Sequence, residues 1–107
     1  MVGLEQGYAA RYPVIMPYDQ LSDDALLERI ARCDRAALGA LYDRYAAAAL
    51  TVATLVTGQR ATAEAVVEQL FWSVWRGEIV AGGRVRHHLM LGARQLARGR
   101  VTFPLDG

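Results

Sequence analysis

The sequence predicts an all-α fold: a compact bundle of three main helices preceded by a short leading helix. Two observations support this prediction. Apolar residues recur at helical spacing through most of the chain, and no segment has both strand periodicity and a partner strand. Of the 107 residues, 53% are hydrophobic and 21% are charged, which is typical of an ordered globular protein. This length is enough for one domain with a modest core.

Composition divides the chain into three parts. Residues 1–20 contain Pro, Gly and Tyr without a helical period, so they are predicted to form an irregular N-terminal arm. We expect the stretch YPVIMPY in this arm to pack on the body of the protein or on a second copy. Residues 21–100 carry the helical periodicity and form the predicted domain, and residues 101–107 form a C-terminal tail with a Pro.

Helix signals define the first two helices. Ser22 is a good N-cap, and the short helix that follows is expected to end near Cys33. Asp34 caps a long second helix that is expected to end near Thr57, because Gly58 is a favourable C-terminal stop. The expected buried positions of this long helix are Leu38, Leu41, Tyr42, Tyr45, Ala48, Ala49, Val52, Leu55 and Val56.

Two further helices are expected, from about Thr62 to Arg76 and from about Arg86 to Arg98, with a glycine-containing turn between them. On the fourth helix, the apolar side consists of Leu89, Met90, Ala93, Leu96 and Ala97. On the third, it consists of Ala63, Val66, Val67, Leu70, Phe71, Val74 and Trp75.

The third helix contains one aromatic residue on its polar side. Phe71 and Trp75 lie one turn apart and are expected in the core. Trp72 falls on the opposite side, between Glu68 and Arg76. Exposed aromatic residues flanked by charges are common anchors in protein interfaces. The alternative is that the N-terminal arm covers Trp72.

The charges are distributed unevenly. The net charge of +1 indicates no particular partner. However, the segment from Ile79 to Leu105 has five arginines and no acidic residue, whereas the segment from Asp19 to Asp43 has most of the acids. This asymmetry predicts a basic end that binds a polyanion, and the alternative is an arginine-rich face in contact only with solvent.

The sequence has few features of an enzyme or a cofactor-binding protein. It lacks a glycine-rich phosphate loop with the required spacing. His87 and His88 are adjacent, so on a helix they point about 100° apart and do not share a metal unaided. Cys33 is the single cysteine, which excludes an intrachain disulfide and fits a reducing compartment. We therefore expect no catalytic site, metal or cofactor.

No apolar run reaches about 18 residues and no signal peptide is recognisable, so a cytoplasmic protein is expected.

Three stretches of the sequence, in the order in which they occur, resemble the motifs of a known protein family. They are LLERIARCDRAALGALYDRY, AEAVVEQLFWSVW and HLMLGARQ. From about Leu21 to Arg100, this order resembles region 2 of bacterial RNA polymerase sigma factors of the extracytoplasmic-function (ECF) type. In that family, the third helix usually reads A-E-D-L/V-V-Q-E/D-x-F-x-x-V-W, and the later motif reads W-L-x-x-I-A-R-N.

The resemblance implies an all-α module that takes part in transcription initiation. In the family, the second and third helices dock on the clamp helices of the largest subunit of the polymerase core. The basic C-terminal part recognises and melts the promoter −10 element and holds unstacked bases. Some members are also controlled by an anti-sigma protein.

Transferred to this sequence, the resemblance implies two sets of site residues. The set for docking on polymerase or another partner is Ala65, Glu68, Gln69, Trp72 and Arg76, with Tyr42 and Tyr45 assigned to the core. The DNA-binding set is Arg84, Arg86, His87, His88, Arg94, Gln95 and Arg98. For Glu68, Gln69 and Arg76 the alternative is an ordinary solvated face. For Arg94 and Arg98 it is a pair of charges that interact with the helix dipole.

The sequence also departs from the family pattern. Ala65 stands where an acidic residue is usual, and the order Glu68-Gln69 is reversed. The loop from Gly77 to Arg86 is shorter than is typical, and the 107 residues have no match to the −35-reading helix-turn-helix domain of the family. Three further replacements are His88 for Trp, Gln95 for Asn and Gly99 for Asp. These departures support a second hypothesis: a degenerate, standalone sigma-like domain that acts as a protein-interaction or self-association module, such as a homodimer, without promoter binding.

Overall fold

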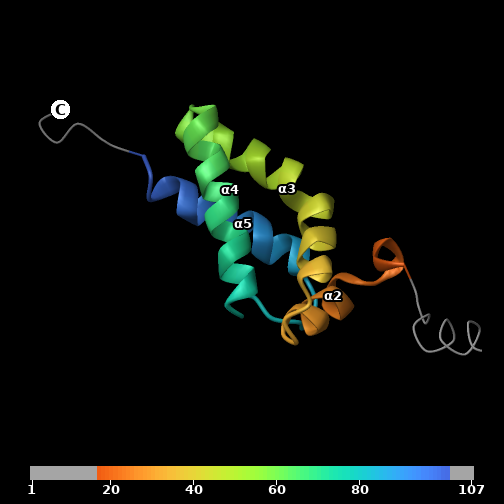
Figure 1. Cartoon of the computed structure of the whole chain (residues 1–107). Helices are drawn as coiled ribbons and strands as arrows, with labels where there is room; N and C mark the ends of the chain where they lie inside the picture. The colour runs from red at the N-terminus through yellow and green to blue at the C-terminus, as the bar shows by residue number, and fades with distance from the viewer. Residues whose placement is uncertain (1–16, 102–107) are drawn as a thin grey trace, which may run out of the picture.

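The computed structural model describes residues 17–101 as a helical bundle (Figure 1). Within this range there are four α-helices, one 3-10 turn and no strand, which confirms the all-helical prediction. The elements are η1 (Tyr18–Gln20), α2 (Asp23–Ile30), α3 (Arg35–Thr57), α4 (Arg60–Trp75) and α5 (Val85–Arg98). Most of the predicted arm and tail, residues 1–16 and 102–107, lies outside the described residues. None of the described helices has the length and apolar character needed to cross a membrane.

The predicted capping residues act as expected. The Ser22 hydroxyl oxygen accepts a hydrogen bond from the Ala25 amide at 3.0 Å at the start of α2. Asp34 similarly accepts from the Ala37 amide at 3.2 Å at the start of α3. These contacts satisfy amide groups that have no partner inside a helix. Gly58 ends α3 in the left-handed region with a φ of 72°, a conformation that glycine adopts without steric cost.

Three predicted boundaries differ from the structure. The first helix ends at Ile30 rather than near Cys33, because Cys33 adopts a positive φ of 66° in a reversing turn. The third helix begins at Arg60, two residues earlier than expected. Residues 18–20 of the predicted irregular arm form the 3-10 turn η1.

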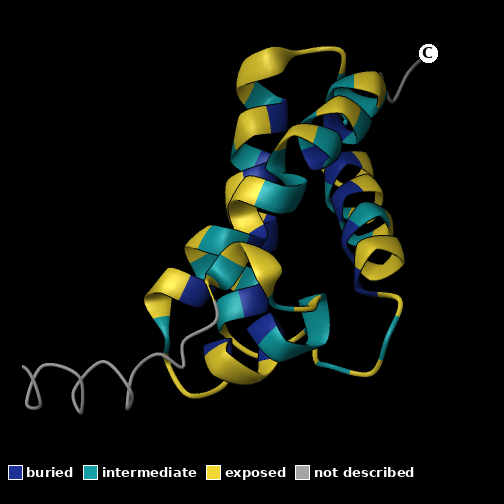
Figure 2. Cartoon of the chain, turned by 90° about the vertical axis from the view of Figure 1, so that its right-hand side faces the viewer, coloured by how far each residue is buried: buried dark blue, intermediate teal, exposed yellow. Residues whose placement is uncertain are grey.

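The core lies where α3 contacts each of the other helices. In Figure 2, the buried residues face the interior between the helices. Large buried side chains include Leu41 of α3, Leu70 of α4 and Leu89 of α5, each at most 1% exposed. A second, smaller cluster near the C-terminal end of α3 consists of Ala53, Ala63, Val66 and Ala97. All seven positions predicted to form the apolar side of α4 contribute to the core, although Trp75 is only partly buried.

Two residues predicted in the buried stripe of α3 are exposed. Tyr42 is 45% exposed, and Leu55 is 81% exposed. Tyr42 lies at the edge of the contact between α3 and α4, where its ring packs edge-on against Phe71 with centroids 5.0 Å apart. Leu55 is near the C-terminal end of α3, on a side that no other described element covers.

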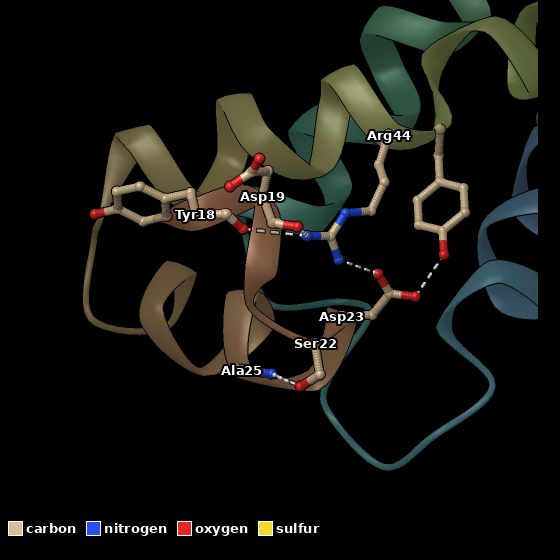
Figure 3. A network of polar contacts seen from close by, with 7 residues as sticks. Tyr18, Asp19, Ser22, Asp23, Ala25 and Arg44 are labelled. Carbon is tan, nitrogen blue, oxygen red and sulfur yellow. Dashed lines mark hydrogen bonds and ion pairs between the residues drawn. The ribbon is translucent and has the colours of Figure 1, made fainter. Parts of the chain in front are cut away.

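Polar contacts join the N-terminal elements to α3 (Figure 3). The Arg44 guanidinium donates to Asp23 at 2.7 Å and to the Tyr18 carbonyl oxygen at 3.1 Å. The Tyr45 hydroxyl donates to the other carboxylate oxygen of Asp23. Burial, followed by this contact with the Asp23 carboxylate, raises the pKa of Tyr45. The Tyr18 hydroxyl donates to Asp34 at 2.6 Å, so η1 and α2 are both attached to α3.

One carboxylate holds the loop between α4 and α5. An oxygen of Asp24, in the first turn of α2, accepts hydrogen bonds from the amides of Gly82 and Gly83, both at 3.1 Å. Both glycines have positive φ angles, 154° and 86°. The next residue, Arg84, also has a positive φ and is the N-cap of α5. Asp24 therefore positions the start of α5 relative to α2.

The two glycines inside helices provide a matched pair of substitutions. A Cβ at Gly39 of α3 would have no neighbour within 4 Å, so Gly39→Ala gains helix propensity and should stabilise the protein by about 0.5–1 kcal/mol. A Cβ at Gly92 of α5 would lie 2.9 Å from the buried Leu70 side chain. Because this contact is too close, Gly92→Ala should not stabilise the protein as Gly39→Ala does. Denaturant unfolding of both variants tests the prediction, and an equal gain at both positions would contradict the close packing of α5 on α4.

The contact between Tyr18 and Asp34 predicts a pH dependence. The Tyr18 hydroxyl is the main cause that lowers the pKa of Asp34 below its usual 3.8, although burial acts in the opposite direction. A lowered pKa in the folded state means that the ionised carboxylate stabilises the fold above the unfolded pKa and that this stability is lost as the pH falls through the folded pKa. Wild type should therefore be more stable than Tyr18→Phe at neutral pH, and the difference should shrink below about pH 4.

Acid-induced unfolding of the two proteins, followed by circular dichroism, measures this difference. The other carboxyl groups are common to both proteins and cancel in the comparison. A difference in stability that stays constant through the acidic range would contradict the assignment.

Candidate functional site

The residues predicted to dock on a partner lie along the outer surface of α4. Glu68, Gln69, Trp72 and Arg76 are exposed and Ala65 is half-buried. Because α4 contacts α3 on one side and α5 on the other, these residues form a ridge between two depressions. The ridge divides the predicted set: Glu68 and Trp72 line the depression on the α3 side, whereas Gln69 and Arg76 line the one on the α5 side.

The depression between α3 and α4, which we call the α3–α4 groove, has a volume of about 660 Å³. Its apolar lining includes Leu38, Tyr42, Leu50, Val67, Phe71 and Trp72. Trp72 is 53% exposed, so much of its ring is available for contact. Together, Tyr42, Phe71 and Trp72 give the groove an aromatic wall of the kind that anchors protein interfaces.

The charged residues of this groove are on α4. Arg60 and Glu64, one turn apart, form an exposed ion pair at 3.1 Å. Glu68 lies one turn further on, and within residues 17–101 it has no ion pair. The groove thus combines an apolar, aromatic lining with a net acidic edge, which suits a segment with apolar and basic side chains.

The second depression, which we call the α4–α5 depression, has a volume of about 520 Å³. Gln69 and Arg76 of α4 face it together with His88 and Gln95 of α5. Both α4 residues already have partners. The Arg76 guanidinium donates to Glu78 at 3.0 Å, and the Gln69 side-chain oxygen accepts from Arg100 at 3.1 Å. The structure therefore brings two residues of the predicted docking set next to two of the predicted DNA-binding set.

All seven residues predicted to bind DNA are exposed, and they lie on α5 or at its N-cap. α5 contains no acidic residue, and within the described chain none of these basic residues forms an ion pair. The rings of His87 and His88 lie edge to face with centroids 5.8 Å apart, on the first turn of the helix. We call the side of α5 that carries His87, His88, Arg94, Gln95 and Arg98 the cationic face of α5. This face can attract phosphate groups and offers flat side chains for stacking. Arg86 lies on a different side of the helix, near Tyr45 of α3, so the structure does not bring it together with the others.

Three exposed apolar residues near these sites were not predicted. Val80, between α4 and α5, is 65% exposed and lines the α4–α5 depression. Tyr42 was assigned to the core but lines the α3–α4 groove. Leu91, which is 41% exposed, lies beside the cationic residues of α5 and lines the α4–α5 depression. The helical spacing of Leu91, three residues after His88, was the available signal.

The described residues do not contain a group of three or more His, Cys, Asp or Glu side chains placed to hold a metal ion. Cys33 is exposed, in the turn between α2 and α3. In the α4–α5 depression, the Ser73 hydroxyl donates a hydrogen bond to the Leu70 carbonyl oxygen at 2.6 Å.

Comparison of the chain with protein-family models, with curated proteins and with solved structures gave no match.

The two tryptophans of α4 should respond differently to truncation. Trp75 packs against the core, so Trp75→Ala should cost about 2–4 kcal/mol of stability. Trp72 is largely exposed, so Trp72→Ala should cost less than about 1 kcal/mol while weakening the binding of a partner. Thermal unfolding of both variants, with the same buffer and protein concentration, provides the measurement. If Trp72→Ala is the more damaging of the two, the orientation of α4 is wrong.

Proposed function

We propose that this chain is a sigma factor region 2-like domain that acts in bacterial transcription initiation. In this role it binds the RNA polymerase core and promoter −10 DNA in the cytoplasm, without enzymatic activity of its own. Two lines of argument support the proposal: the order of sequence motifs that resembles ECF sigma factors, and the presence of two chemically different surfaces on one small bundle. An anti-sigma protein is a further partner that the resemblance implies.

The observation that carries the proposal is the cationic face of α5. Five exposed residues that are basic or hydrogen-bonding occur there without a neighbouring acid on the helix. Arginine is suited to phosphate because its guanidinium donates two parallel hydrogen bonds. Single-stranded nucleic acid requires a positive surface combined with flat groups on which bases stack. Arg94, Arg98 and the His87–His88 pair supply these two kinds of group.

The α3–α4 groove supports the second half of the proposal. A helix that presents apolar and basic side chains would bury Trp72 and Tyr42 and place its positive charges near Glu68. The clamp helices of the polymerase are the partner that the resemblance implies. Gln69 and Arg76 face the α4–α5 depression instead, so we assign them to the region between the two binding surfaces.

A second candidate function is favoured by the exposure of Tyr42 and Trp72 in one groove. A sigma-like domain that no longer binds promoters would still use this groove for protein interaction or for a homodimer. Light scattering separates the two functions. A homodimer that becomes monomeric on Trp72→Ala and does not bind polymerase supports the second function, whereas a monomer that binds polymerase supports the first.

The proposed function predicts salt-dependent binding to a single-stranded oligonucleotide with a −10 sequence. For single strands, the logarithm of the binding constant falls with the logarithm of the salt concentration, with a slope of about −0.7 per phosphate neutralised. Replacing Arg94 and Arg98 by Ala should weaken binding and make this slope less steep by about 1.4. Fluorescence anisotropy at several salt concentrations measures both effects. Arg32→Ala is the matched control, because Arg32 is an exposed arginine in the turn after α2 and is not part of α5.

A pull-down with core RNA polymerase tests the other surface. Wild type and the Arg94→Ala/Arg98→Ala variant should be retained, and Trp72→Ala should be retained poorly. A chain that retains neither polymerase nor the oligonucleotide would refute the proposed function.

A further inference from the structure

The start of α5 is not held by a capping side chain of its own. α2 and α3 each begin with a side chain that accepts from a first-turn amide, Ser22 and Asp34. The N-cap of α5 is Arg84, whose side chain makes no such hydrogen bond. Arg84 also has a positive φ of 59°, a conformation that a non-glycine residue keeps where its surroundings impose it. The contacts on either side of Arg84 therefore set the position at which α5 begins.

These contacts are made with α2 and with the core. Before the N-cap, the amides of Gly82 and Gly83 both donate to one carboxylate oxygen of Asp24 at 3.1 Å, where the loop passes the first turn of α2 (Figure 1). After the N-cap, the Val85 side chain is 3% exposed and packs in the core. Among residues 17–101, Asp24 is the one side chain that hydrogen-bonds to the backbone of residues 79–84.

The first turn of α5 carries the two histidines of the cationic face. His87 and His88 are the third and fourth residues after the N-cap, and their rings lie edge to face. The His88 amide donates to the Arg84 carbonyl oxygen at 3.0 Å. The backbone that carries both rings therefore follows the position of Arg84.

The remainder of α5 has anchors that do not depend on this loop. Leu89, Ala93 and Ala97 are fully buried on the side of the helix that faces the core. Arg94 and Arg98 each directly follow one of these alanines, so core packing holds them in place. The loop thus controls the histidines of the cationic face and leaves its arginines unaffected.

We infer that Asp24, which is not part of the cationic face, is a positioning residue for nucleic-acid binding. Through the amides of the loop and the first turn of α5, it fixes the His87–His88 pair where the rings stack on unstacked bases. It does so without contact with the nucleic acid. This inference rests on the proposed function. Loss of the Asp24 hydrogen bonds should remove base stacking and leave the phosphate contacts of Arg94 and Arg98.

Two substitutions isolate the hydrogen bonds of Asp24 from its charge. Asp24→Ala and Asp24→Asn both remove one negative charge, so both change the electrostatic attraction of nucleic acid equally. The Asn side-chain oxygen still accepts from the two glycine amides, whereas Ala has no acceptor. A difference in affinity between the two variants therefore reports the contact with the loop.

Fluorescence anisotropy of the full-length proteins measures this difference with two probes. One is the single-stranded −10 oligonucleotide, and the other has the same length with abasic residues in place of its bases. Loss of one base stack weakens binding by about fivefold or more. Asp24→Ala should therefore bind the −10 oligonucleotide at least about fivefold more weakly than Asp24→Asn, with the same salt dependence. The two variants should bind the abasic probe equally.

The abasic probe separates positioning from simple destabilisation. A smaller fraction of folded protein would weaken the binding of both probes by the same factor. Equal affinities of the two variants for the −10 oligonucleotide, or the same loss with the abasic probe, overturn the inference.

A double-mutant cycle tests whether Asp24 acts through the histidines. In a His87→Ala/His88→Ala background, Asp24→Ala and Asp24→Asn should bind the −10 oligonucleotide with the same affinity, because the rings that Asp24 positions are gone. A fivefold difference that persists in this background overturns the inference.

The same proteins separate this inference from the proposed function. If wild type and both Asp24 variants bind the −10 oligonucleotide equally, the proposed function stands and the inference is overturned. If wild type does not bind it, the proposed function fails, and the role of Asp24 in binding fails with it.

Hydrogen exchange measured by NMR tests the positioning itself, whether or not nucleic acid binds. The amides of Gly82, Gly83 and His88 should exchange faster in Asp24→Ala than in Asp24→Asn, while the amides of residues 93–98 exchange alike. Equal exchange at all of these amides overturns the positioning of α5 by Asp24.

Discussion

Packing of alanine against its neighbours sets the distance between the helices of this protein. Six alanines are fully buried: Ala37, Ala49 and Ala53 of α3, Ala63 of α4, and Ala93 and Ala97 of α5. Small side chains let helices approach closely, but they leave little room for rings inside the bundle. Among residues 17–101, Phe71 is the one aromatic side chain that is buried. In the same range, Tyr42 and Trp72 are the two exposed aromatic residues, and together with Phe71 they form the aromatic wall of the α3–α4 groove.

The ridge on α4 keeps the two proposed binding surfaces apart. Trp72 faces α3, whereas Gln69 and Arg76 face α5, and their hydrogen bonds to Arg100 and Glu78 hold them on that side. A protein partner in the α3–α4 groove would therefore leave the cationic face of α5 free for nucleic acid. Because α4 forms one wall of the groove and packs against α5, a displacement of this helix would affect both sites.

The fold was predictable where the signals are local. Asp34 and Gly58 identified α3 because a cap and a left-handed glycine act on the backbone next to them.

Burial was predicted less well, because a helical wheel gives the direction of a side chain but not the extent of the neighbouring helices. Leu55 lies on the same side of α3 as the buried Ala37, about five turns further along. The short α2 lies at the N-terminal end of α3 and does not extend to Leu55 (Figure 1). The exposure of Tyr42 and the division of the predicted docking residues by the ridge likewise depend on how α3, α4 and α5 are placed, which the sequence pattern does not specify.

The hydrogen bonds of Asp24 to the loop before α5 have a consequence for the order of folding. They join residues 58 and 59 positions apart in the chain, so they form only after a long stretch of backbone has been brought together. Contacts that form after the transition state have φ-values near zero. Loss of the Asp24 carboxylate would then accelerate unfolding more than it slows folding, because the interaction is absent when the barrier is crossed. The lifetime of the folded bundle, more than the speed at which it forms, would thus depend on a single carboxylate in its shortest α-helix.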